Sequence, residues 1–321
     1  MTAARHGIQA SLSAAREGRA MSLAVVLATE GSTYVKPGAL ALFGPDGERQ
    51  GWLSGGCLEA DIALRAEAAL RAGAMALMEI DTRSDEDLLS GSAVGCRGRL
   101  HLALLPLPEM SGWDAIAHAW LARGGALRLQ VDGHGRCSAS LGSQTHEWRL
   151  PVAEGSVASP TPLHARIAPP PAVALFGAGP ESETLLPWLR ELGWMTTLVE
   201  KRPRWLAQGV LADRHIETTP TQTLAAGLDV DAALVMHHHF ELDRESLDAL
   251  AAHPVPFIGL LGPRRRQQDL FQLMTAAQRE VLTPRLRSPV GLHLGGDGPQ
   301  AIALSIAAQL QRWRDEEDES A

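Results

Sequence analysis

The chain has 321 residues, of which 45% are hydrophobic and 21% are charged, as in ordinary globular domains. Its 29 basic and 37 acidic residues give a formal net charge of −8, which disfavours general binding to nucleic acid or to anionic membranes. No apolar run reaches the roughly 18 residues that span a bilayer, and the N-terminus lacks the apolar core of a signal peptide. We therefore expect a cytoplasmic protein.

The first half of the chain mixes short strands with helices. Hydrophobic runs predict buried strands at residues 22–29, 39–43, 50–53, 74–80 and 100–105. Helical periodicity predicts helices within residues 1–19, at about 58–71 and at 113–122. The turn residues at 132–135 predict a hairpin. Together these elements predict an α/β domain over residues 1–150.

A proline-rich stretch separates the two halves. Residues 151–171 have little apolar periodicity, which is typical of a linker between domains. The prolines are Pro151, Pro160, Pro162, Pro169, Pro170 and Pro171.

The second half, residues 172–321, alternates strand with helix. The apolar run AVALF at 172–176 is typical of a central parallel strand, and a helix to about residue 192 follows it. Further strands are predicted at 195–199, 231–236 and 255–260. Such alternation predicts a doubly wound, Rossmann-like parallel sheet.

A glycine motif opens the first helix of that half. Gly177 permits a tight turn, and Gly179 lets a phosphate approach the backbone at the helix N-terminus. Glu200 ends the next predicted strand, where a carboxylate takes a ribose hydroxyl. Ser182 replaces the third glycine of the usual motif. The fold signal is therefore stronger than the signal for a bound dinucleotide, and a Rossmann domain without a dinucleotide stays open.

Three cysteines, Cys57, Cys96 and Cys137, fit neither a disulfide framework nor a zinc-finger spacing. Cys57 follows Ser54-Gly55-Gly56 at the predicted start of a helix, where free N–H groups stabilise a thiolate or bind an anion. Either Ser54 or Glu59 is a candidate cap for this helix. Composition alone favours the alternative, a buried cysteine beside a glycine turn, because free cysteines are commonly buried.

The other two cysteines lie in different settings. Cys96 is in a glycine-rich loop beside Arg97, a guanidinium that lowers a thiol pKa or binds phosphate. Two such loop cysteines, Cys57 and Cys96, together suggest a soft-metal or sulfur-handling site. Cys137 follows a hairpin turn in a predicted strand, and we expect it to be structural.

Two more polar clusters follow predicted strands of the second half. The histidines at 237–239, with Asp243, lie where open α/β sheets bind ligands. Adjacent histidines on an extended chain point in opposite directions, so a polar cleft is favoured over a metal site. Gly259 and Gly262 lead to Arg264 and its two following arginines, a candidate phosphate clamp or a solvated helix start.

Taken together, these motifs resemble the XdhC/CoxI family of xanthine and carbon-monoxide dehydrogenase maturation factors, over nearly the whole chain. The second half shows the resemblance in Gly177-Ala178-Gly179, His238, Asp243, Gly259, Gly262 and Ser288-Pro289-Val290-Gly291. The first half shows it in Gly31-Ser32-Thr33, Pro37-Gly38-Ala39, Ser54-Gly55-Gly56-Cys57-Leu58-Glu59 and Gly95-Cys96-Arg97-Gly98.

The resemblance implies a chaperone that binds the molybdenum cofactor (molybdopterin), supports its sulfuration and inserts it into a molybdenum hydroxylase. On this basis Cys57 and Cys96 are candidate metal or sulfur contacts, and the loops around Gly31, Ser32, Pro37, Gly38, Gly55 and Gly56 hold the pterin and its phosphate. The implied partners are the apo-hydroxylase and a cysteine desulfurase, and the implied assembly is a homodimer. Binding between the two domains is expected.

Two other functions remain open from the residues. An NAD(P)-dependent oxidoreductase would use Gly177, Gly179 and Glu200 for the cofactor, and His238 with Asp243 for proton transfer. A nucleotide-gated sensor would use the Rossmann domain to control a partner. The two loop cysteines outside that domain favour the chaperone.

Overall fold

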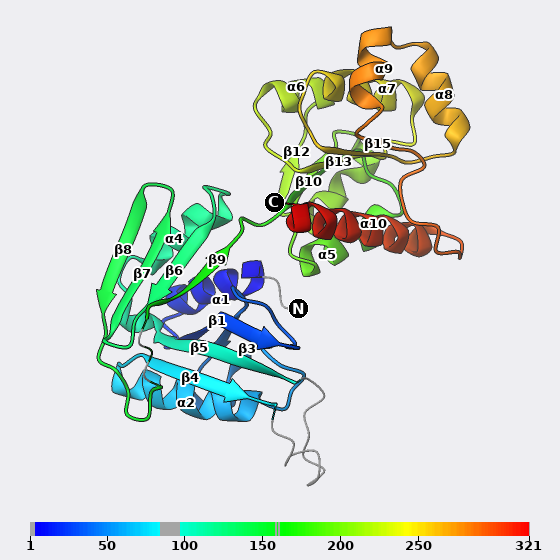
Figure 1. Cartoon of the computed structure of the whole chain (residues 1–321). Coiled ribbons are helices and arrows are strands. Elements are labelled where there is room, and N and C mark those ends of the chain that lie inside the picture. The colour runs from blue at the N-terminus through cyan, green and yellow to red at the C-terminus, as the bar shows by residue number, and fades with distance from the viewer. Residues whose placement is uncertain (1–3, 84–96, 158, 160, 321) are drawn as a thin grey trace. The chain divides into compact units, whose positions relative to one another are not determined.

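The computed structural model describes residues 4–83, 97–157, 159 and 161–320, and divides into two compact units, residues 1–170 and 171–321. Each unit contains its own sheets and its own core, so each is described by itself (Figure 1).

The first unit is built around a five-stranded antiparallel sheet of order β3-β2-β1-β5-β4. Alternate residues of β1 face opposite sides, so that Ala24 and Val26 pack toward α2, whereas Leu23, Val25 and Leu27 pack toward α1 and α4. The elements are α1 (Ala4–Arg16), β1 (Ser22–Gly31), β2 (Leu40–Phe43), β3 (Arg49–Gln50), α2 (Glu59–Ala72), β4 (Ala76–Asp81), β5 (Gly98–Pro106) and α4 (Trp113–Leu121).

A second, four-stranded antiparallel sheet of order β8-β7-β6-β9 completes this unit. Its inward residues, including Leu129 and Ala139, join α1, α4 and one face of the first sheet in a single hydrophobic core. The strands are β6 (Leu127–Val131), β7 (Arg136–Leu141), β8 (Gln144–Arg149) and β9 (Leu163–Ile167).

The second unit is a six-stranded, wholly parallel sheet of order β12-β11-β10-β13-β14-β15. This is the strand order of a Rossmann fold, with the crossing point between β10 and β13. Helices α5 and α10 cover one face, and α6, α7, α8 and α9 cover the other. The strands are β10 (Ala172–Phe176), β11 (Met195–Val199), β12 (Arg214–Ile216), β13 (Ala232–Val235), β14 (Phe257–Leu260) and β15 (Leu286–Arg287). The helices are α5 (Ser182–Glu191), α6 (Pro220–Ala225), α7 (Phe240–Ala251), α8 (Arg264–Gln272), α9 (Ala276–Leu282) and α10 (Pro299–Ser320).

The predicted α/β class and the Rossmann-like second half are confirmed. Two local predictions need correction. The stretch 151–171 contains β9, which pairs with β6 from Leu127–Ile167 to Val131–Leu163, because its alternating residues Ala165 and Ile167 fill the core of the second sheet. The strand predicted at 50–53 is only β3, because the chain leaves the ladder at Gly51, whose φ of +98° is a conformation that glycine adopts easily. None of the described helices is long and apolar enough to cross a membrane.

Candidate functional site

The loop before α2 is held in place by a buried carboxylate. Glu59, in the first turn of α2, is 3% exposed, and its Oε1 accepts hydrogen bonds from Leu53 N at 3.1 Å and Ser54 N at 2.8 Å. The Ser54 hydroxyl donates to the other carboxylate oxygen. Burial raises the pKa of Glu59, but the hydrogen bonds from Ser54 and Leu53 outweigh it, and the pKa lies below its ordinary value. The charged carboxylate is therefore a structural part of the loop.

Ser54 also organises the turn above Glu59. Its Oγ accepts hydrogen bonds from Gly56 N at 3.1 Å and Leu58 N at 3.2 Å, and it lies 3.8 Å from Cys57 Sγ. Gly56 has a φ of +106°, which turns the chain sharply into the helix. As a result, Cys57 is exposed at the start of α2 while the polar groups of the loop point inward.

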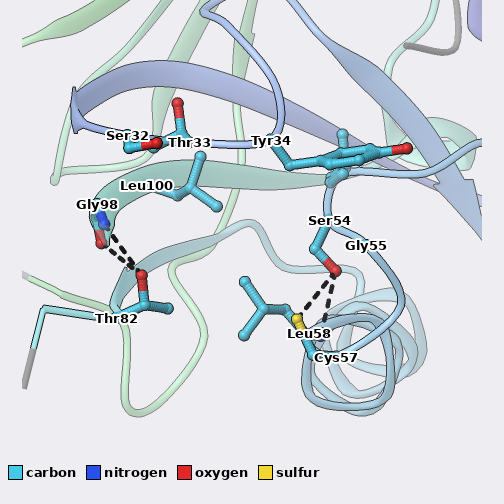
Figure 2. Close-up of a pocket in the computed structure, with 11 residues that line it drawn as sticks. Ser32, Thr33, Tyr34, Ser54, Gly55, Cys57, Leu58, Thr82, Gly98 and Leu100 are labelled. Atoms are coloured by element: carbon cyan, nitrogen blue, oxygen red, sulfur yellow. Dashed lines mark hydrogen bonds between the residues drawn. The ribbon is translucent and has the colours of Figure 1, made fainter. Parts of the chain in front are cut away.

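Cys57 faces a small pocket formed by three loops. Figure 2 shows Ser32, Thr33 and Tyr34 on one side of this pocket, and Ser54, Cys57 and Leu58 on the other. Thr82 and Gly98 close one end, where the Thr82 hydroxyl donates to Gly98 O at 2.9 Å and accepts from Gly98 N at 3.1 Å. The pocket is lined by Ser32, Thr33, Tyr34, Leu53, Ser54, Gly55, Cys57, Leu58, Thr82, Gly98 and Leu100.

Two glycines bring the loops of the pocket together. Gly31 and Gly98 pair directly at the ends of β1 and β5. A Cβ at Gly98 would lie 2.5 Å from Ser32 O and 2.7 Å from Glu30 O, and one at Gly31 would lie 2.8 Å from Arg97 O. Any side chain at Gly98 would therefore push the Ser32 loop away from the pocket.

Two exposed aromatic side chains lie near the loops of the pocket. Tyr34, which is 48% exposed, lines the pocket, and Trp52 is 46% exposed. The Trp52 ring lies next to Gly56, since a Cβ there would be 3.7 Å from the ring edge, and the Arg49 guanidinium lies 3.7 Å from the centre of that ring. Tyr34 thus offers an apolar, planar surface in the pocket, and Trp52 offers one beside the Gly56 turn, with Arg49 against its ring.

The other predicted residues of the first unit have different places. Pro37 is outside the pocket lining. Gly38 donates its N–H to Val26 O of β1, and it packs against β9, since a Cβ would lie 3.2 Å from Arg166 O. Arg97 is exposed, and its guanidinium donates to Arg83 O at 3.2 Å. Cys96 lies outside the described residues, so only Cys57 of the proposed pair is described. Within the described ranges, no group of three or more histidine, cysteine or acidic residues is arranged to hold a metal ion.

Cys137 contrasts with Cys57. It is 1% exposed on β7, and burial raises the pKa of its thiol to about 12. Its position inside the core of the first unit fits the structural role expected for it.

In the second unit, the glycine loop after β10 faces the loop after β13, but its polar groups bind one another. Gly177 has a φ of +90°, and any side chain on it would overlap the His237 ring. His238 Nε2 lies 3.1 Å from the Glu181 carboxylate. Ser182 is buried, and its hydroxyl accepts from Gly179 N at 3.1 Å.

Glu200 is at the end of β11, as the motif requires, but its carboxylate is engaged. Its two oxygens accept from Ala178 N at 2.8 Å and from the backbone N and guanidinium of Arg202. Arg202 also donates to His237 O at 2.7 Å and to Ala178 O at 3.0 Å, so it joins the two loops. Burial raises the pKa of Glu200, but the Arg202 hydrogen bonds outweigh it and leave a lowered pKa. This arrangement counts against a role of Glu200 in ribose binding.

The three histidines diverge, as expected for adjacent residues. His237 is buried, and its Nε2 lies 3.0 Å from the Ser246 hydroxyl, which itself donates to Leu242 O. Burial, followed by the nearby Arg202 charge, lowers the pKa of His237 to about 4. His238 reaches Glu181, and His239 is exposed.

Asp243 is not placed for the proton transfer with His238 that an oxidoreductase would need. Its carboxylate accepts from His237 N at 3.1 Å and from the Arg266 guanidinium, and only 1% of it is exposed. Burial raises the pKa of Asp243 more than Arg266 lowers it. Its hydrogen bonds therefore support the loop that carries His238.

The remaining predicted glycines of this unit serve packing. A Cβ at Gly259 would lie 2.5 Å from Val290 and 2.7 Å from Leu234, so β14 needs glycine there. Gly262 has a φ of +123°. Arg264 and Arg265 are exposed at the start of α8, whereas Arg266 binds Asp243.

Comparison with known proteins adds the family. The model of the XdhC and CoxI family matches residues 14–81, and the model of the XdhC Rossmann domain matches residues 173–310. The chain belongs to the XdhC and CoxI family. The resemblance noted in the motifs is thereby confirmed. Cys57 with its loop falls in the first matched region, and Glu181 with His238 falls in the second.

Individual relatives agree with this family assignment. A Bacillus subtilis protein described as a probable xanthine dehydrogenase subunit is 29% identical over 312 residues, which cover 91% of this chain and 92% of that protein. A crystal structure described as a xanthine dehydrogenase from Bacillus halodurans has a TM-score of 0.81 and 27% identity, with 97% of this chain and 96% of that chain covered. An uncharacterised Escherichia coli protein, YqeB, is 36% identical over 100 residues, which cover 29% of this chain and 18% of that protein.

The pocket includes residues that sequence patterns did not single out. Thr82 and Leu100 lie outside both matched regions of this family member and belong to no motif. Tyr34 and Trp52 lie next to motif residues, and their signal is the rarity of large aromatic side chains in this chain, which has one tyrosine and eight tryptophans. Only the fold showed that Tyr34 lines the pocket and that Trp52 lies against Gly56.

Proposed function

We propose that this member of the XdhC and CoxI family binds the molybdenum cofactor at the Cys57 pocket as a maturation chaperone. It would support sulfuration of the cofactor and deliver it to a molybdenum hydroxylase of the xanthine or carbon-monoxide dehydrogenase type. The observation that carries the proposal is the exposed Cys57 thiol, held at the start of α2 by a buried Ser54–Glu59 network.

The donor set suits such a ligand. A cysteine sulfur is a soft donor, of the kind that binds transition metals with sulfur ligands. Cys57 is presented outward because Glu59 and Ser54 satisfy the inner polar groups of the loop. When bound, the cofactor would supply a molybdenum centre and dithiolene sulfurs, and Cys57 would hold it at that end.

The size of the pocket limits what enters it. Its cavity volume is about 20 Å³, and a cavity of roughly 10–15 Å³ on the same measure holds one water molecule. The pocket therefore has room for little more than one water. A pterin is much larger, so we infer that one end of the cofactor reaches the pocket while the ring system lies over its rim. Tyr34 offers a planar apolar face in the pocket, and Trp52, with the Arg49 guanidinium over its ring, offers another beside the neighbouring Gly56 turn.

The remaining contacts follow from the family resemblance. Ser32 and Gly55 line the pocket and would contact the pterin or its phosphate. Arg97 is a candidate phosphate contact through its exposed guanidinium, and Cys96 is a second candidate sulfur contact. The proposed partners are the apo-hydroxylase and a cysteine desulfurase, and the proposed assembly is a homodimer.

An NAD(P)-dependent reaction in the second unit receives less support. The residues that it would need, Glu200, His238 and Asp243, are bound to Arg202, Glu181 and Arg266. A nucleotide-gated sensor would need the same loop. We therefore favour the chaperone.

The test uses the full chain, produced in a host that makes molybdopterin and purified without oxygen. Molybdenum and the oxidised pterin fluorophore are measured per protein, in the wild type, in Cys57→Ala and in Cys137→Ala as the matched control. We expect bound pterin in the wild type and in the control, and a loss in Cys57→Ala. Pterin that is unchanged in Cys57→Ala would move the contact elsewhere. A wild type with nicotinamide nucleotide in place of pterin would overturn the chaperone.

A further inference from the structure

The crossing point of the second sheet is where a Rossmann fold receives its ligand. The carboxyl ends of β10 and β13 meet there, and the glycine loop leads into α5. In a dinucleotide-binding domain, the second glycine leaves space for the pyrophosphate against the helix N-terminus. In this chain that glycine is Gly179.

The space next to Gly179 is already filled by two side chains. A Cβ at Gly179 would lie 2.7 Å from His238 Nε2 and 2.8 Å from Glu181 Oε2. These two groups are 3.1 Å apart, and Glu181 is only 5% exposed. They reach Gly179 from different elements, Glu181 from the start of α5 and His238 from the loop after β13.

The backbone of His238 is adapted to this position. Its φ is +52°, a left-handed conformation that histidine adopts uncommonly. Asp243 and Arg202 hold the same loop, because Asp243 accepts from His237 N and Arg202 donates to His237 O. The backbone of His237, the residue before the imidazole of His238, is therefore held by two contacts.

We propose that Glu181 and His238 take the place of the pyrophosphate in the second unit and exclude NAD(P) from it. A carboxylate at the N-terminus of α5 gives this helix end the negative charge that a phosphate would otherwise supply. A diphosphate at the same place would overlap both side chains and would lie against a like charge. The unit keeps the fold of a dinucleotide-binding domain, but the Glu181 carboxylate occupies the position of the phosphate at the N-terminus of α5.

A separate contact competes with a ribose for its usual partner. A ribose hydroxyl would compete with Ala178 N and Arg202 for the Glu200 carboxylate, which is 2% exposed. The proposal concerns only the second unit, so it does not depend on pterin binding at Cys57.

The test measures NADH binding to the full chain by fluorescence, for the wild type and three variants. Glu181→Ser removes one of the two groups beside Gly179 and introduces a residue that caps helices well. The double variant Glu181→Ser with His238→Ala removes both groups. The matched control is Glu191→Ala, which removes an exposed carboxylate at the other end of α5.

We expect no saturable binding by the wild type or the control up to about 1 mM NADH, the upper end of common affinities. We expect the double variant to bind at least about tenfold more tightly than the wild type, and Glu181→Ser to lie between them. Saturable binding by the wild type would overturn the proposal. The proposal would also fail if a double variant with an unchanged unfolding temperature gained no affinity. If the double variant does not fold, the same judgement rests on Glu181→Ser.

Discussion

The two units contain the same local device, a glycine turn that leads into a helix, and they use it in opposite ways. In the first unit Glu59 lies beneath the turn, accepts hydrogen bonds from Leu53 and Ser54, and leaves Cys57 exposed above it. In the second unit Glu181 lies against the turn itself, beside Gly179 and His238. A glycine turn at a helix start thus becomes open or closed according to where its nearby carboxylate points.

The two turns differ in where the hydrogen-bond partners of the carboxylate come from. Glu59 is satisfied by donors within its own loop, so nothing needs to cover that loop from outside. Glu181 receives its partner from a distant segment, the loop after β13, which is thereby drawn over the helix start. The predictions below test this contrast between an open and a closed turn.

The largest expected effect concerns the two described thiols of the first unit. Cys57 is exposed, whereas Cys137 is buried and the pKa of its thiol is raised to about 12. Since the thiolate is the reactive form, we expect iodoacetamide at neutral pH to modify Cys57 at least about a thousandfold faster than Cys137. Peptide mass spectrometry over time measures both sites separately. Equal rates would mean that the Cys57 turn is not the open one.

Removal of the buried carboxylate should have the next largest effect. Glu59→Ala leaves the N–H groups of Leu53 and Ser54 and the Ser54 hydroxyl without their acceptor. We expect the first unit to lose about 3–4 kcal/mol of stability. Asp61→Ala, which removes an exposed carboxylate from the same turn of α2, should cost about 0.5 kcal/mol.

Urea unfolding, followed by hydrogen exchange of peptides from α2 and β1, measures the stability of the first unit in both variants. Similar losses in the two variants would show that Glu59 acts only through the helix dipole and does not hold the loop.

The sequence could predict most strands of the fold, because their hydrophobic patterns are local. The strands at 172–176 and 195–199 agree with β10 and β11 residue for residue. For 172–176 the reason is that a continuous apolar run marks a central parallel strand. By contrast, β9 was hidden among prolines, since its pairing with β6 depends on residues more than thirty positions away. Short-range patterns carry no information on such a partner.

The candidate site was only partly predictable, for the same reason. Ser32, Ser54, Gly55 and Cys57 belong to motifs and do line one pocket. Thr82 and Leu100 join them because β1 and β5 pair, and no local pattern marks them. The motif also placed Glu200 correctly at the end of a strand, but the inward turn of Arg202 that occupies it depends on the fold of two loops.

The closed turn should make the second unit sensitive to acid. His237 has an ordinary pKa of 6.5 in the unfolded chain and about 4 in the folded unit, mainly because it is buried. Between these values the unfolded chain binds a proton that the folded unit does not, so stability present above pH 6.5 is lost as the pH falls toward 4. The loss should be about 2–3 kcal/mol.

Because Glu200, Asp243 and other nearby groups also titrate, the variant His237→Gln isolates this contribution. Hydrogen exchange of β10 and β13 amides as a function of pH measures the stability of the second unit. The stability of the wild type relative to His237→Gln should fall by about 2–3 kcal/mol between pH 6.5 and pH 4. If the stability difference between the two proteins does not depend on pH, His237 is not the cause of the acid sensitivity of the second unit.

The smallest expected effect tests whether the open turn is a ligand surface. Trp52 is 46% exposed beside Gly56, so Trp52→Leu should change stability by less than about 0.5 kcal/mol. Stacking of a planar heterocycle on an aromatic ring contributes about 1–3 kcal/mol, so the pterin that co-purifies should fall near tenfold. Trp188→Leu, at a tryptophan of α5 with 38% exposure, is the matched control and should retain its pterin. If both variants keep the same pterin content, the ring of Trp52 is no part of the surface. If both lose it, the loss reflects general damage. A loss in Trp52→Leu alone would mean that the open turn is completed by its aromatic neighbours, as the closed turn is completed by His238.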